Sequence, residues 1–382
     1  MYKILEVDVM LVFIRTVLSL VLTALIGISG LFGMTGDKAT GHDDYKEYKN
    51  VILMIGDGMG FNTLEATKKL RNVDLAMETM PVLSQSETRS LTNKVTDSAA
   101  GGTALACGVR TYNGAIGVYA FNPFANRWQY PVSLSEYAIE QGKLAGVVTT
   151  DETSGATPSS FSAHAIARTS EKNISNDQMT SDLTLVWGCA SESVTPEKCA
   201  ENGFEYLTTR AQMNALEEGS RSFAQFDWAD IADVKSEKDT PYLAEMTAKA
   251  IDLLDDDEDG FFLMVEGAHI DKFSHSNDFN GSTAHTVEFD KAIEVALEYA
   301  AQDGETLVVV TADHETGGIT LNESTGEYYY TSGSHTGVNV PVFVSATDAG
   351  FVSGEAYKNC EVSTQLARVM GADEKDFPRI KI

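Results

Sequence analysis

The sequence predicts an α/β protein with a doubly wound, mostly parallel central sheet and helices on both of its faces. Two observations predict this fold class. Four short, continuous apolar segments are typical of strands buried on both faces of a parallel sheet: Val51–Ile55, Leu144–Thr149, Phe261–Val265 and Leu307–Thr311. Between these segments, Leu243–Leu254 and Ser282–Ala301 repeat apolar residues at a spacing near 3.6, which is typical of helices.

Composition and charge narrow the class of protein. The chain has 382 residues, of which 43% are hydrophobic and 22% are charged, so it is globular and not disordered. Its net charge of −28 argues against a nucleic-acid partner, because the phosphate backbone would be repelled. A pocket that binds anionic groups in such a protein must be made locally positive, by metal ions or by a buried arginine.

The first 36 residues differ from the remainder of the chain. Residues 16–36 are uncharged and rich in Leu, Val and Ile, which predicts a secretory leader or an uncleaved N-terminal anchor over residues 1–36. A buried first helix is the alternative, although the unbroken apolar run lacks polar periodicity. A polar linker is expected at 37–47, followed by one domain at 48–382 with an irregular insertion at about 173–240. We therefore expect an exported protein, periplasmic or extracellular, with no other membrane segment.

The chain has four cysteines. Cys189 and Cys199 lie ten positions apart in a Gly/Ser/Pro-containing segment, without a neighbouring His or third Cys that would complete a zinc knuckle. This spacing predicts a disulfide. Cys107 and Cys360 are interpreted as small buried hydrophobic residues, with a second disulfide as the less favoured alternative.

Candidate metal ligands follow the predicted strands. Asp57 comes after the first strand, Glu266 after the third, and Asp313-His314 after the fourth, while the second leads into a loop that reaches Thr157. In open α/β sheets, sites form beyond the carboxyl ends of the strands, so these side chains are expected to meet at one edge. Taken singly, Asp57 could equally be a turn residue that binds its own backbone.

Three further side chains extend this set. Asp271 and His275 are four residues apart, which places both on one face of a helical turn, and His335 lies in a Gly/Ser-rich loop. The alternatives are an intrahelical Asp–His pair and a surface histidine. Asp together with His suits zinc, whereas Asp, Glu and Thr without His suit magnesium. The sequence therefore offers ligands for more than one metal.

A small-residue segment that begins at Thr96 predicts a helix N-terminus, with Thr96 or Asp97 as the cap. Ser98 would lie in the first turn, where helix N–H groups and the positive end of the dipole favour a nucleophile that must accept a phosphoryl group. The alternative is that Ser98 merely caps the helix. A serine-hydrolase interpretation is weaker, because no G-x-S-x-G sequence is present.

These segments resemble the alkaline phosphatases, over roughly residues 48–370. Five motifs occur in that family's order: V-I-L-M-I-G-D-G-M-G, V-T-D-S-A-A-G-G-T-A, V-E-G-A-H-I-D-K-F-S-H, V-T-A-D-H-E-T-G-G and S-G-S-H-T-G. The resemblance implies that Ser98 is the phosphorylated nucleophile and that Arg168 binds the phosphate. It assigns a first zinc site to Asp271, His275 and His335, a second to Asp57, Asp313 and His314, and a magnesium site to Asp57, Thr157 and Glu266. Lys272 matches a position near the phosphate.

The resemblance also implies a mechanism. Two zinc ions would bind the attacking and leaving oxygens of an in-line displacement, Ser98 would form a phosphoserine, and zinc-bound hydroxide would hydrolyse it. Small phosphate monoesters are the expected substrates, and a homodimer is the expected assembly. The alternatives are a phosphodiesterase or other esterase of the same metal-dependent superfamily, and an exported metal-binding protein without turnover.

The chain departs from the family pattern at Gly155. Counting back from Thr157 and Arg168, this position is Asp or His in familiar members. Because glycine has no side chain to offer, magnesium would rely on Asp57, Thr157, Glu266 and water, which predicts a weak third site. The alternative is that Asp151 or Glu152 substitutes from a neighbouring position.

Overall fold

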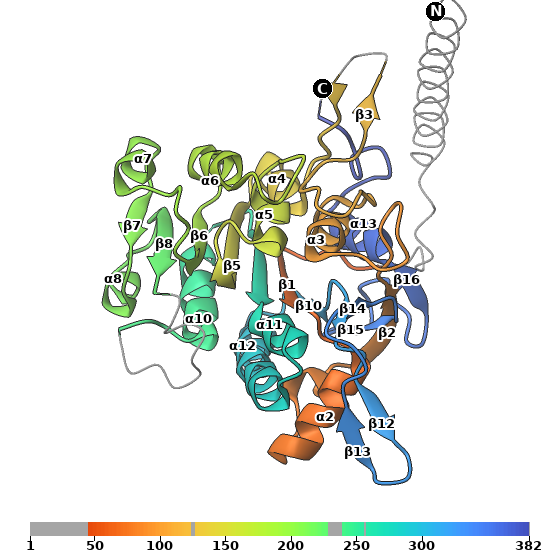
Figure 1. The fold of residues 1–382 in the computed structure, drawn as a ribbon. Helices are drawn as coiled ribbons and strands as arrows, with labels where there is room; N and C mark the ends of the chain where they lie inside the picture. The colour runs from red at the N-terminus through yellow and green to blue at the C-terminus, as the bar shows by residue number, and fades with distance from the viewer. Residues whose placement is uncertain (1–44, 124–126, 228–238, 256, 382) are drawn as a thin grey trace, which may run out of the picture.

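The computed structural model describes residues 45–123, 127–227, 239–255 and 257–381 (Figure 1). Its centre is a ten-stranded sheet in the order β16-β2-β15-β10-β1-β9-β5-β6-β8-β7. In chain order the strands are β1 (Asn50–Gly56), β2 (Val82–Glu87), β5 (Leu144–Glu152), β6 (Leu185–Cys189), β7 (Glu205–Leu207), β8 (Ser222–Phe226), β9 (Phe261–Gly267), β10 (Thr306–Thr311), β15 (Val340–Val344) and β16 (Ala356–Lys358).

The four strands predicted from apolar segments are β1, β5, β9 and β10, and they lie side by side at the centre of the sheet. β1 pairs in parallel with β10 on one side and with β9 on the other, and β9 pairs in parallel with β5. Among the described strands of this sheet, only β15 runs antiparallel to its neighbours. The predicted doubly wound, mostly parallel sheet is therefore confirmed.

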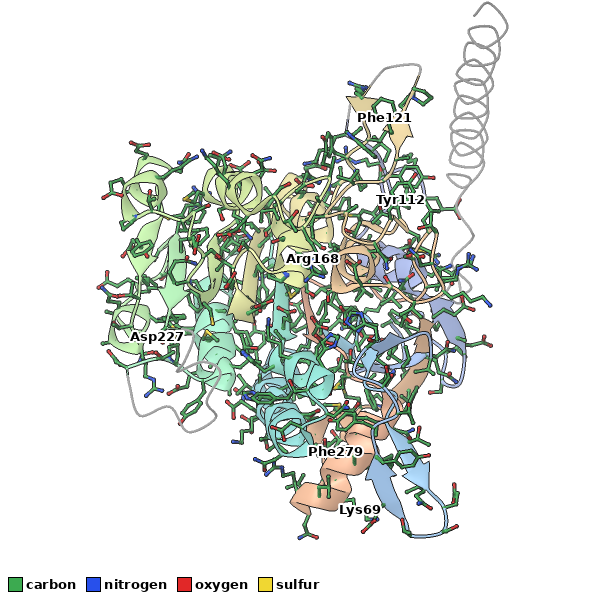
Figure 2. All side chains as sticks on the ribbon, in the orientation of Figure 1. Lys69, Tyr112, Phe121, Arg168, Asp227 and Phe279 are labelled. Carbon is green, nitrogen blue, oxygen red and sulfur yellow. The ribbon has the colours of Figure 1, made fainter. Side chains whose placement is uncertain are left out.

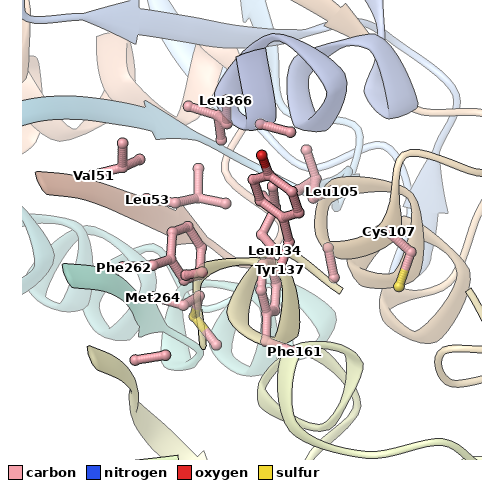
Figure 3. Close-up of a cluster of buried hydrophobic side chains, with 14 of the residues drawn as sticks. Val51, Leu53, Leu105, Cys107, Leu134, Tyr137, Phe161, Phe262, Met264 and Leu366 are labelled. Atoms are coloured by element: carbon pink, nitrogen blue, oxygen red, sulfur yellow. The ribbon is translucent and has the colours of Figure 1, made fainter. Parts of the chain in front are cut away.

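Helices cover both faces of the sheet, because successive strand residues point to opposite sides. Val51 and Leu53 of β1 belong to one buried cluster, and Ile52 and Met54 belong to the other. The first cluster is covered by α3 (Ser98–Cys107), α4 (Leu134–Glu140), α5 (Ala156–Ser162) and α13 (Asn359–Val369), as Figure 3 shows. The second is covered by α2 (Phe61–Arg71), α10 (Leu243–Leu254) and α12 (Phe279–Asp303). Burial of each large apolar side chain in these clusters contributes about 1.5–3 kcal/mol.

The segment at 173–240 is not irregular, contrary to the sequence expectation. Its described part contains α6 (Glu171–Thr180), α7 (Pro196–Glu201) and α8 (Arg210–Asn214), together with the strands β6, β7 and β8. These strands extend the sheet by parallel pairing at one edge (Figure 1). In β8 the polar Gln225 obscured the pattern, whereas β6 is a continuous apolar segment that was not predicted. Gln225 is buried in β8, where its amide donates to Thr153 Oγ1 at 2.8 Å, so tertiary contacts make the polar residue tolerable.

The predicted disulfide is wrong. All four cysteines lie in the described residues and are free thiols. Cys189, at the end of β6, packs in the cluster on one face of the sheet, whereas Cys199, in α7, packs in the cluster on the other. The sheet therefore separates the two sulfurs, and burial raises the pKa of Cys199 to about 11. Cys107 is fully buried, as expected.

Shorter elements complete the fold around the sheet: the 3₁₀ helix Ala76–Thr79, α11 (His269–His275), and the paired strands β3 (Phe121–Asn122) with β4 (Arg127–Trp128), β11 (Glu315–Thr316) with β14 (His335–Thr336), and β12 (Thr320–Asn322) with β13 (Glu327–Tyr329). Within the described ranges, none of the helices has both the length and the apolar character needed to cross a membrane. The predicted leader at 1–36 and residues 37–44 of the predicted linker lie outside those ranges.

Candidate active site

The candidate ligands meet at the carboxyl edge of the central strands. Ile55 of β1 is level with Thr311 of β10 on one side and with Glu266 of β9 on the other. Asp57 therefore emerges from β1 beside Glu266 and beside the Asp313-His314 pair that follows β10. Because parallel strands end at the same edge, the register alone explains why residues more than 200 positions apart become neighbours.

The first group consists of Asp271 and His275, which lie in α11, and His335, which begins β14. His275 Nε2 lies 3.4 Å from Asp271 Oδ2 and 3.0 Å from His335 Nε2, and His335 Nε2 lies 3.5 Å from Asp271 Oδ1. One ligand atom from each residue falls within 4.8 Å of the others. A single cation could therefore contact all three.

Backbone carbonyls orient both histidines of the first group. His275 Nδ1 lies 2.8 Å from the carbonyl oxygen of Gly333, and His335 Nδ1 lies 3.0 Å from that of Thr96. Because a carbonyl oxygen can only accept a hydrogen bond, Nδ1 must carry the proton in each ring. Each Nε2 is thereby left with a lone pair that faces the group, which is the arrangement that metal-binding histidines adopt.

The second group is centred on His314, whose Nε2 faces three oxygen-bearing side chains. It lies 3.5 Å from Asp57 Oδ1, 3.2 Å from Asp313 Oδ2 and 3.2 Å from Ser98 Oγ. Asp57, His314 and Asp271 also place ligand atoms within 4.8 Å of one another. Asp271 therefore lies between the two groups, so that the two candidate metal positions are adjacent.

Thr316 links these groups, and the sequence analysis missed it. Its hydroxyl donates to Asp271 Oδ1, and its oxygen lies 3.3 Å from His314 Nδ1. Because that hydroxyl proton is already committed to the carboxylate, His314 Nδ1 acts as the donor and its Nε2 keeps the lone pair. Thr316 ends the two-residue strand β11, and its spacing of two residues from His314, which favours the same side of an extended chain, was the signal that could have identified it.

The buried carboxyl groups of the site favour the binding of cations. Burial, followed by the charges of neighbouring carboxylates, raises the pKa of Asp57 well above its usual range. Burial and the charge of Asp271 raise the pKa of Asp313 to about 7. Asp57 Oδ1 and Asp313 Oδ2 are buried without a hydrogen-bond partner among the described residues. Buried anionic oxygens without partners are costly unless a cation contacts them, so the two groups fit divalent metals with mixed Asp/His ligands such as zinc.

A third set of candidate ligands contains only oxygen donors. Thr157, in α5, and Glu266, in β9, are each about 1% exposed, and Glu266 accepts a hydrogen bond from Thr149. Burial and then the charge of Asp151 raise the pKa of Glu266 to about 8. Together with Asp57, this set suits a hard cation such as magnesium.

Ser98 is the first residue of α3, as expected, and it is buried. Asp97 is the N-cap: its carboxylate accepts a hydrogen bond from Ala100 N at 3.0 Å. The Ser98 hydroxyl therefore lies at the positive end of a helix and beside His314. A serine that merely capped the helix would occupy position 97 instead.

The two basic residues differ in their surroundings. Arg168 follows α5 and its side chain is 42% exposed; its nearest carboxylate is that of Asp97, at 3.5 Å (Figure 2). Lys272 lies in α11 directly after Asp271, and its ammonium contacts Asp151 Oδ1 at 2.8 Å. Burial would lower the pKa of Lys272, but the charges of Asp151, Asp57 and Glu266 outweigh this effect and raise it.

Known proteins show the same sequence pattern and the same fold. The alkaline phosphatase family model matches residues 48–185 and 195–332. Alkaline phosphatase 4 of Bacillus subtilis is 36% identical over 327 residues, which cover 79% of this chain and 68% of that protein. The alkaline phosphatase of the Antarctic bacterium TAB5 is 31% identical, with a TM-score of 0.73 over 86% of this chain and 99% of that structure.

A structure of a variant of the same Antarctic enzyme, in which a histidine is replaced by aspartate, has magnesium bound in a site called M3. It is 30% identical to this chain, with a TM-score of 0.73 and coverage of 86% and 99%. The family match, the identities and the shared fold agree with the ligand groups at the carboxyl edge of the sheet. The chain therefore belongs to the alkaline phosphatase family of enzymes.

Proposed function

We propose that the enzyme hydrolyses small phosphate monoesters through a phosphoserine at Ser98, with zinc in the two Asp/His groups and magnesium in the oxygen-only set. The observation that carries this proposal is the position of Ser98 Oγ. It lies 3.2 Å from His314 Nε2, at the N-terminus of α3 and at the edge of the ligand groups.

The first half of the reaction forms a new bond between Ser98 Oγ and phosphorus, while the bond from phosphorus to the ester oxygen breaks and the alcohol departs. N–H groups in the first turn of α3 and the guanidinium of Arg168 offer donors to the phosphoryl oxygens. Bound metals would supply the positive charge that lowers the pKa of the serine hydroxyl and offsets the charge of the phosphoryl group.

The second half transfers the phosphoryl group from Ser98 to water and releases inorganic phosphate. The side chain of Arg168 is 42% exposed and its ion pair with Asp97 is long, at 3.5 Å, so it can follow the phosphoryl oxygens through both halves. The donors and metal positions named here would all contact the phosphoryl group and not the leaving group. We therefore expect a broad range of monoester leaving groups.

The decisive experiment compares a chromogenic phosphate monoester with the corresponding diester and sulfate ester, with and without a chelator, in the wild type and in Ser98→Ala. We expect monoester hydrolysis alone, its loss with chelator and its recovery with zinc. Acid quenching should trap phosphate on Ser98 in the wild type and on no residue in the variant. Faster hydrolysis of the diester or the sulfate, or phosphate trapped at another residue, would overturn the proposal.

Two further parts of the proposal concern the protein as a whole. The uncharged segment at residues 16–36 supports export, with the catalytic domain periplasmic or extracellular. The family resemblance supports a homodimer. Cell fractionation tests the first part, and sedimentation of the purified protein tests the second.

A further inference from the structure

The turn between β5 and α5 contains a glycine whose backbone does not require glycine. Gly155 is the N-cap of α5, with φ −53° and ψ 156°, a conformation that residues with side chains also adopt. Conformational freedom therefore does not explain why glycine occupies this position. The explanation is the lack of space for a side chain.

The space beside Gly155 is filled by Asp151. A Cβ atom at position 155 would overlap Asp151 Oδ2 and would lie 2.9 Å from the carbonyl oxygen of Glu152. A side chain at position 155 would therefore displace the Asp151 carboxylate, and the Glu152 carbonyl would have to shift slightly. The carboxylate of Asp151 thus occupies the place where a side chain of residue 155 would begin, which is the place of Asp or His in the family pattern.

Several contacts hold the Asp151 carboxylate in this place. Its Oδ1 accepts hydrogen bonds from Lys272 Nζ and from Glu152 N, both at 2.8 Å, and the side chain is 14% exposed. The backbone N–H of Asp151 donates to Thr149 Oγ1 at 2.8 Å, and the Thr149 hydroxyl donates in turn to Glu266. Asp151 is therefore connected, through one threonine, to a carboxylate of the oxygen-only set.

We propose that Asp151 supplies the acidic side chain of the magnesium site in this chain, in the place that Gly155 leaves open, and that it positions Lys272 at the same time. This inference rests on the magnesium site of the proposed function. It replaces the sequence expectation of a weak site held by Asp57, Thr157, Glu266 and water alone. It also makes the pair Asp151/Gly155 a unit, because a side chain at 155 and a carboxylate at 151 exclude each other.

The test measures magnesium binding to the full chain at fixed, stoichiometric zinc, by equilibrium dialysis and by the magnesium-dependent shift in Tm. Asp151→Ala and Asp151→Asn should weaken magnesium binding about 10- to 100-fold, the usual effect of removing a residue that supports a metal site. Glu152→Gln is the matched control, since Glu152 is the neighbouring carboxylate but is exposed, and it should bind magnesium as the wild type does.

Two more variants test the exchange of positions. Gly155→Asp alone should be destabilised, because two carboxylates would compete for one space. The double variant Asp151→Gly/Gly155→Asp should recover magnesium binding, because residue 155 then supplies the carboxylate that Asp151 supplies in the wild type. If Asp151→Ala fails to fold, the nearly isosteric Asp151→Asn decides.

Wild-type magnesium affinity in Asp151→Asn, or loss of magnesium in Glu152→Gln in its place, would overturn the inference. A wild type that binds no magnesium would overturn both this inference and the magnesium site of the proposed function. The variant results are separable from failure of the rest of the proposed function, which is read from zinc content and from phosphate trapped on Ser98. An enzyme that traps phosphate on Ser98 while Asp151→Asn binds magnesium normally refutes only the role of Asp151.

Discussion

Asp271 shows how one residue can belong to two ligand groups. Its Oδ2 faces His275, its Oδ1 faces His335 and accepts the hydrogen bond of Thr316, and the same residue lies within reach of Asp57 and His314. From the sequence, the spacing of Asp271 and His275 assigns the aspartate to the first metal site alone. In the structure, Asp271 lies between the two groups and can serve both.

Asp271→Ala and His335→Ala should therefore differ in metal content. The histidine variant should lose about one zinc per chain, because it removes a ligand from one group only. The aspartate variant should lose zinc from both groups, since it removes the carboxylate between them and leaves the hydroxyl of Thr316 without its acceptor. Metal analysis after dialysis measures the difference, and equal losses in the two variants would count against the shared position.

At the scale of the element, α3 positions Ser98 through two glycines that allow close packing. A Cβ at Gly101 would lie 3.0 Å from the carbonyl oxygen of Asp313, and a Cβ at Gly102 would lie 2.9 Å from Ser160 Oγ in α5. The helix thus touches both the loop that carries Asp313 and the helix that carries Thr157. The small residues of α3 therefore set the distance from Ser98 to the metal ligands.

Gly102→Ala should lower both stability and activity, although alanine by itself favours a helix interior by about 1 kcal/mol over glycine. The reason is that the added methyl group displaces α3 from α5. Removing the opposing hydroxyl in Gly102→Ala/Ser160→Ala should recover part of the Tm and of kcat. If Gly102→Ala alone is more stable than the wild type and has an unchanged kcat, the packing of α3 against α5 is not tight at this position.

At the scale of the whole molecule, the strongly acidic chain concentrates carboxylates in its interior as well as on its surface. Glu266 and Asp313 have pKa values near 8 and 7, well above their values of about 4 in an unfolded chain. The metal-free folded state therefore binds more protons than the unfolded state between about pH 4 and pH 8. The contribution of these two carboxyl groups to the stability of the metal-free protein therefore falls as the pH rises through that window. The buried His269, whose pKa is lowered to about 3, contributes the opposite sign up to about pH 6.5.

This gives a prediction with a definite sign. With chelator present, the Tm should fall from about pH 6.5 to pH 8, above the range in which the buried histidines oppose the effect, as the buried carboxyl groups lose their protons. With zinc and magnesium bound, the fall should be absent or reversed, because cations stabilise the deprotonated form. Thermal unfolding at each pH, with and without metals, measures both curves. A Tm of the metal-free protein that rises over this range would contradict the buried acidic cluster.

Much of the fold could be predicted from local pattern. Continuous apolar segments identify β1, β5, β9 and β10 because a strand covered on both faces has no polar side, and α10 was predicted with its observed boundaries. Of the three strands that extend the sheet, β6 is a continuous apolar segment that was not predicted, whereas β7 and β8 contain polar residues and could not be found in this way. The amide of Gln225 in β8, for example, donates to Thr153, 72 residues away, and a local pattern cannot show such a partner.

The sequence by itself determined the central sheet, the ligand types at its carboxyl edge and the helix start at Ser98, because each depends on neighbours within a few residues. Only the tertiary structure decided the rest. It placed the sheet between Cys189 and Cys199, set Thr316 between Asp271 and His314, and filled the space beside Gly155 with Asp151. These outcomes depend on distances between residues that share no local pattern, and packing alone fixes such distances.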